Sequence, residues 1–107
     1  MIDDYQTAME LMDKMKSSLP IAAYPSNKCV FIFRDKNIKI KASQLLEISD
    51  VYYSGDAGGI LCSLKFPFET EQAYVVSLTH LRFVDTHPLA KEIRKYQVQR
   101  VRNLARQ

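Results

Sequence analysis

Apolar side chains recur every three or four residues along the first eighteen positions of the chain. Tyr5, Met9, Met12 and Met15 stand at the spacing that places side chains on one face of a helix. The pattern predicts a helix over residues 2–18, which Pro20 ends. Residues 19–27 contain two prolines and several small polar residues, so we expect a connection there with at most a short extended piece.

From residue 28 the period changes to two, and β-branched and aromatic residues become frequent. The pattern predicts five strands over residues 28–34, 38–42, 45–53, 60–66 and 73–84. The first two are expected to form a hairpin through residues 35–37, and residues 67–71 are expected to connect the last two. Because no helix is predicted between strands, the strands should form an antiparallel meander, either an open sheet or a small curled barrel.

A second helix is predicted at the C-terminal end. The polar residues 85–87 followed by Pro88 are a helix-start signal, and the helix should extend to about residue 105. The whole chain, residues 1–107, is therefore expected to be a single α+β domain with one helix at each end. No apolar run approaches the ~18 residues of a membrane span, and Asp3 and Asp4 precede any apolar stretch, unlike in a signal peptide. We expect a cytoplasmic protein without a membrane partner.

Gly55, Gly58 and Gly59 form the one glycine cluster of the sequence. A phosphate-binding loop would need a helix after the glycines and a Lys-Ser or Lys-Thr pair at fixed spacing, and neither is predicted. Residues 54–59 are instead expected to form a tight reversal between two strands, in which glycine supplies positive φ.

The chain has two cysteines, Cys29 and Cys62, and neither stands in a metal-binding or redox motif. Both alternate with apolar residues, so we expect buried, reduced thiols. A catalytic pair of Cys62 and His80 ranks third among the functional hypotheses, because burial would make the thiol unreactive. His87, just before Pro88, should help to cap the C-terminal helix. The sequence indicates no metal ligand set and no cofactor.

The net charge of +3 is unevenly distributed. Residues 88–107 carry six basic side chains and one acidic one, whereas the rest of the chain is slightly acidic. On an ideal helix four of the basic residues lie within about 60° of each other. These are Lys91, Lys95, Arg102 and Arg106. The helix is expected to dock through the opposite stripe, which consists of Leu89, Ala90, Ile93, Tyr96, Gln97, Val101 and Leu104, with Arg100 at its border.

This row of cations is the strongest functional signal in the sequence. The first hypothesis is a non-enzymatic binding module whose C-terminal helix contacts an anionic partner through Lys91, Lys95, Arg102 and Arg106, with nucleic acid ranked before an acidic protein. The alternative is an assembly module, such as a homodimer, in which the row is only a solvated face. No zinc-finger, KH or RNP signature accompanies the row.

Overall fold

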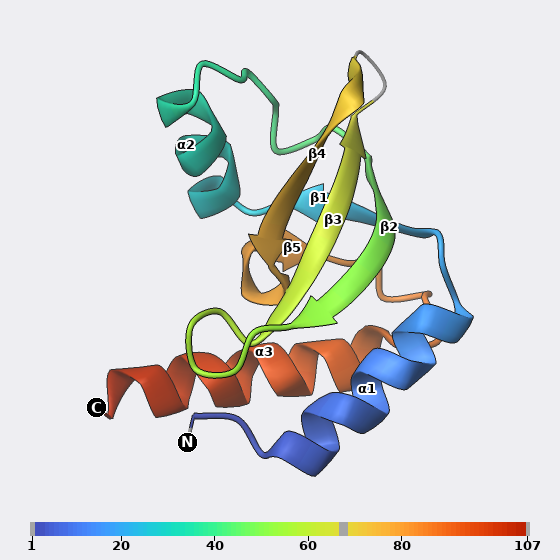
Figure 1. Cartoon of the computed structure of the whole chain (residues 1–107), viewed down its shortest axis with the longest axis vertical. Coiled ribbons are helices and arrows are strands. Elements are labelled where there is room, and N and C mark those ends of the chain that lie inside the picture. The colour runs from blue at the N-terminus through green and yellow to red at the C-terminus, as the bar shows by residue number, and fades with distance from the viewer. Residues whose placement is uncertain (1, 67–68, 107) are drawn as a thin grey trace.

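An antiparallel sheet and the helices around it make up the fold (Figure 1). The computed structural model describes residues 2–66 and 69–106, without the side chains of residues 66–73. The described elements are α1 (Tyr5–Ser17), β1 (Ile21–Pro25), α2 (Asn27–Asp35), β2 (Leu46–Tyr53), β3 (Ile60–Phe66), β4 (Glu69–Ser77), the 3-10 turn η1 (Leu78–His80), β5 (Leu81–Arg82) and α3 (Ala90–Ala105). The five strands lie in the order β4-β3-β2-β1-β5, and every neighbouring pair is antiparallel. The expected α+β fold is confirmed.

Helices α1 and α3 lie together at one end of the curled sheet, whereas α2 stands apart from them (Figure 1). α1 packs on β2, α3 packs on η1, and α2 packs on β1. The core between these layers is built from buried side chains such as Met15, Ile48, Ile60 and Ile93, each at most 1% exposed.

The N-terminal helix and the β2–β3 hairpin follow the sequence pattern. α1 begins at Tyr5 because Asp4 caps it by accepting a hydrogen bond from the Thr7 amide. In β2 the alternation of buried residues skips one position, because a bulge shifts the register between Ile48 and Asp50. The reversal at residues 54–59 is confirmed, with all three glycines at positive φ.

The predicted hairpin of residues 28–34 and 38–42 is wrong. Residues 27–35 form α2, whose first turn is capped by Ser26 through a hydrogen bond from the Cys29 amide. Cys29 and Phe33 are buried, and Phe31 between them is 60% exposed. Cys29 and Phe33 are four positions apart, and residues at that spacing share a face in a helix as well as in a strand. Their pattern is therefore compatible with either structure. Residues 38–42 bury Ile40 as the alternation implied, but they pair with no described strand.

The first strand is β1, in the segment that was expected to be a connection. It lies between β2 and β5, and its Ile21, Ala23 and Pro25 face the core. The predicted strand 73–84 is in fact divided into β4, η1 and β5, because Ser77 caps the turn η1 with its side chain. Of the expected connection 67–71, residues 67 and 68 lie outside the described residues, and β4 begins at Glu69.

α3 begins at Ala90, two residues after Pro88, the last residue of its start signal. The Nδ1 atom of His87 accepts a hydrogen bond from the Leu89 amide, 3.0 Å away, as a cap would. Along α3 the buried residues are Ala90, Ile93, Tyr96 and Arg100. Within residues 2–66 and 69–106, no helix is both long and apolar enough to cross a bilayer.

Candidate functional site

All four cations that the sequence singled out are exposed on α3. Lys91, Lys95, Arg102 and Arg106 face solvent on the side of the helix opposite its buried residues. Within the described part of the chain, none of the four lies within 4.0 Å of a carboxylate oxygen. No carboxylate of the described residues therefore compensates their charge.

The other exposed charges on α3 itself, Glu92 and Arg94, are paired. Glu92, the acidic residue of its first turn, lies 2.9 Å from the ammonium of Lys14 on α1. Arg94 lies 3.1 Å from Asp85 in the preceding loop. Exposed pairs of this kind contribute little to stability. They matter here because Glu92 is engaged with α1 and Arg94 with the loop, which leaves the four cations as a separate group.

The expected docking stripe of α3 is correct in its first half and wrong in its second. Ile93 and Tyr96 are buried, but Val101 is 55% exposed and Leu104 is 42% exposed. Val98 beside them is also exposed. The C-terminal half of α3 extends past the sheet, so no core is available there to cover these side chains (Figure 1).

Beyond Ile93, α3 is held mainly by polar contacts. The Gln97 amide nitrogen donates hydrogen bonds to the backbone carbonyls of Leu78 and Leu81, each 2.7 Å away. Leu78 is the first residue of the turn η1, and Leu81 directly follows the turn. A polar residue on the docking face of α3 thus ties this helix to the turn that interrupts the strand.

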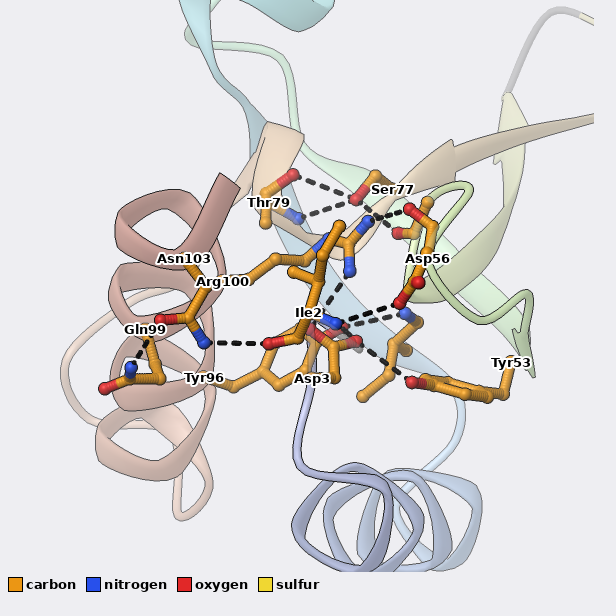
Figure 2. Close-up of polar contacts among 12 residues, drawn as sticks. Ile2, Asp3, Tyr53, Asp56, Ser77, Thr79, Tyr96, Gln99, Arg100 and Asn103 are labelled. Carbon is orange, nitrogen blue, oxygen red and sulfur yellow. Dashed lines mark hydrogen bonds and ion pairs between the residues drawn. The ribbon is translucent and has the colours of Figure 1, made fainter. Parts of the chain in front are cut away.

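A buried carboxylate network lies next to these contacts (Figure 2). The Asp3 carboxylate accepts a hydrogen bond from the Tyr96 hydroxyl at 2.8 Å and from the Tyr53 hydroxyl at 3.2 Å. Its other oxygen lies 3.0 Å from the Arg100 guanidinium. The Asp3 and Arg100 side chains are only 2% and 3% exposed. We call the three donors, Tyr53, Tyr96 and Arg100, the carboxylate cage.

The cage is closed by backbone groups of the glycine loop, residues 54–59, and of Ile60 at the start of β3. The Ile60 amide donates to the Tyr96 hydroxyl, and Arg100 donates to the Asp56 carbonyl at 2.9 Å. A Cβ atom on Gly59 would collide with the Tyr96 hydroxyl, the Asp3 carboxylate and the Arg100 guanidinium. Glycine is therefore required at position 59 by the close approach of the cage as well as by its φ of +67°.

Burial and the neighbouring Asp3 carboxylate raise the pKa of both Tyr53 and Tyr96. Both hydroxyls therefore stay protonated at neutral pH and can donate hydrogen bonds. A pocket of about 400 Å³ opens beside the cage, between α1 and α3. Its lining includes the apolar side chain of Leu11 together with Asp3, Tyr96 and Arg100. Four other charged residues also line it, namely Asp4, Glu10, Glu92 and Lys95.

The third hypothesis, a Cys62 and His80 enzyme, gains no support from the geometry. Cys62 is fully buried in β3, and burial raises the pKa of its thiol to about 12. Burial and the positive charge of Lys28 lower the pKa of His80. In the described part of the chain, no hydrogen bond joins the two side chains. Both cysteines are buried and free, as expected.

Among the described residues, no group of three or more His, Cys, Asp or Glu side chains is arranged to hold a metal ion. Comparison of the chain with protein-family models, curated proteins and solved structures gives no match. The class defined by the fold is a small α+β domain. The two features that bear on its function are the exposed cations of α3 and the carboxylate cage.

The carboxylate cage is not among the sites predicted from the sequence, although one signal for it was present. Arg100 falls on the same side of the ideal helix as Ile93 and Tyr96, and a charged residue on a buried face requires a partner. Asp3 was noticed only as an acidic residue near the N-terminus. Its 97-residue separation from Arg100 left no local pattern that could join them.

Proposed function

We propose that this protein is a non-enzymatic binding module in which α3 contacts an anionic macromolecule, with nucleic acid ranked before an acidic protein surface. The observation that carries the proposal is the group of four exposed cations on one side of α3, Lys91, Lys95, Arg102 and Arg106, none of which has a carboxylate partner among the described residues.

The spacing of these cations supports nucleic acid as the partner. Lys91 and Arg106 are fifteen residues apart, which corresponds to about 22 Å along a helix. Duplex DNA presents one negative charge per about 1.7 Å of its axis, so one duplex segment can meet all four cations. Such contacts release condensed counterions and need no sequence-specific recognition.

Salt-dependent binding to duplex DNA and to RNA tests this proposal. Four phosphate contacts should give a slope of about −3.6 when log K is plotted against log salt for duplex DNA, from about 0.9 for each neutralised phosphate. Replacing Lys91, Lys95, Arg102 and Arg106 with Gln should remove most of that slope. The fold should survive, because exposed charges contribute little to stability.

A matched control separates local contacts from net charge. Lys16, Lys36, Lys39 and Lys41 are also exposed and lie outside α3. Their replacement by Gln changes the net charge by the same amount but should leave most of the salt slope in place. Absence of DNA and RNA binding at low salt, or equal losses in the two fourfold variants, would refute the proposal.

A second candidate is an assembly module, and the exposed apolar residues Val98, Val101 and Leu104 favour it. Exposed apolar side chains that lie together often mark a protein interface. The test is the molecular mass from light scattering. A dimer that becomes a monomer when Val98 and Val101 are changed to Asp would support assembly, whereas a wild-type monomer at all concentrations would exclude self-association.

A further inference from the structure

The carboxylate cage has the composition of a ligand-binding site, although its occupant here belongs to the same chain. A buried ion pair is weak evidence for stability, because apolar side chains of similar size often stabilise a fold equally well. The chain nevertheless brings together a buried guanidinium, a buried carboxylate, the buried Tyr96 hydroxyl and the partly buried Tyr53 hydroxyl. That arrangement is specific for a carboxylate.

The donors of the cage are positioned independently of Asp3. Tyr96 and Arg100 are four residues apart on α3, and Tyr53 is the last residue of β2. The Ile60 amide donates to the Tyr96 hydroxyl, which turns the hydroxyl proton toward the carboxylate. The Asp56 carbonyl holds Arg100 in the same way. The site is therefore preorganised by the sheet, the glycine loop and α3.

Asp3, in contrast, lies on a segment that belongs to no helix or strand, because α1 begins at Tyr5. Besides the cage contacts, the segment is held at Ile2. The Ile2 amide donates to the Asp56 carboxylate at 2.9 Å, and the Asn103 side chain donates to the Ile2 carbonyl at 2.8 Å (Figure 2). Both contacts involve side chains, so the segment can leave the cage without breaking a strand ladder or a helix.

The pocket between α1 and α3 gives room for a ligand larger than the Asp3 side chain. Its volume of about 400 Å³ is within the usual range for small-molecule sites. The lining includes Leu11 and Tyr96, which suit an apolar group, and Arg100, which suits an acid. It also includes the carboxylates of Asp4 and Glu10, so the acid group of a ligand is favoured only next to Arg100. We propose that the carboxylate cage binds the carboxylate of an external organic acid with an apolar body, and that Asp3 is an internal ligand which this acid displaces.

Competition with Asp3 gives a measurable consequence. The apparent affinity of wild-type protein is reduced by the fraction of molecules in which the cage is open. Removing the Asp3 carboxylate removes this competition. Asp3→Ala should therefore bind an external acid at least tenfold more tightly than the wild type does. Of the exposed cations of α3, only Lys95 lines the pocket. The difference between Asp3→Ala and the wild type depends on Asp3 and Arg100, so it can be told apart from a loss of nucleic-acid binding.

The experiment titrates phenylacetate into wild-type protein, Asp3→Ala and Asp4→Ala, with NMR shifts of the Ile60 amide as the readout. Asp4 is the matched control, since it is the neighbouring acidic residue and lines the same pocket, but its carboxylate bonds to Thr7 and not to the cage. Tight binding should appear in Asp3→Ala alone, should be lost in Asp3→Ala with Arg100→Gln, and should not occur with phenylacetamide. In wild-type protein, saturation should accelerate hydrogen exchange of the Ile2 amide.

Equal affinities in wild-type protein and Asp3→Ala, or no binding to Asp3→Ala, would overturn the proposal. If Asp3→Ala does not fold by itself, the same ligand provides the test. Refolding in phenylacetate but not in chloride of equal ionic strength would support a carboxylate site, and failure to refold in either would count against it.

Discussion

Substitution of Gly59 by Ala is the sharpest test of the carboxylate cage as a structural element. At this position φ is +67°, which strains any residue that carries a Cβ atom. The added Cβ would lie 2.8 Å from the Asp3 carboxylate and 2.9 Å from the Arg100 guanidinium, and it would also collide with the Tyr96 hydroxyl. The cage must therefore open to admit a single methyl group.

Gly55 supplies a matched control within the same loop. Its φ of +64° is nearly equal, but a Cβ there would meet nothing within 4 Å. Gly55→Ala should cost only the strain of a left-handed residue, about 1–2 kcal/mol. Gly59→Ala should cost the same strain and, because it separates a buried charge from its partner, about 3–5 kcal/mol more. That total approaches the whole stability of many domains, which is about 5–15 kcal/mol.

Urea unfolding followed by circular dichroism measures the difference between the two variants. For a urea m-value of about 1–3 kcal/mol/M, an additional loss of about 4 kcal/mol lowers the midpoint by roughly 1.5–4 M. The fold of Gly55→Ala should remain intact under conditions where Gly59→Ala is largely unfolded. If the two variants have the same midpoint, the close packing of the cage against residue 59 contributes nothing to stability, and the reasoning fails.

Two further predictions concern buried titratable groups. Burial raises the pKa of the Cys62 thiol to about 12, so a thiol reagent should modify Cys62 only after unfolding. Cys62→Ser should destabilise the fold by about 1–3 kcal/mol. Modification of Cys62 in the native protein within seconds would contradict its burial. The pKa of His80 is lowered in the fold, so below the ordinary value of about 6.5 the unfolded state binds a proton that the folded state resists. The stability contribution of neutral His80 is complete above that pH and is lost as the pH falls toward the folded pKa. The free energy of unfolding should therefore decrease less between pH 7 and 5 in His80→Gln than in the wild type. Identical pH profiles of the two proteins would be inconsistent with a lowered pKa of His80.

The elements that the sequence predicted correctly are those in which a local signal had one interpretation. Pro20 and the spacing of Met12 and Met15 define α1, and three glycines within five residues define the β2–β3 reversal. The burial of Cys62 also followed from its apolar neighbours. In each case, residues close together in the chain contained the whole physical reason.

Tertiary contacts decided the segments whose local signal was ambiguous. Cys29 and Phe33 satisfy both a helical and an extended period, and the Ser26 cap together with packing on β1 selects the helix. β1 is short and bounded by Pro20 and Pro25, which predict a connection, yet it becomes a strand because β2 and β5 supply hydrogen bonds on both sides.

The candidate sites divide in the same way. The four exposed cations of α3 could be predicted because helical period alone places Lys91 and Lys95 opposite the buried face. The carboxylate cage could not, because Asp3, Tyr53 and Arg100 are distant in sequence and each is an ordinary residue in its local setting. A charge becomes stable in the interior only when folding brings its partner within hydrogen-bonding distance, and no local pattern records that event.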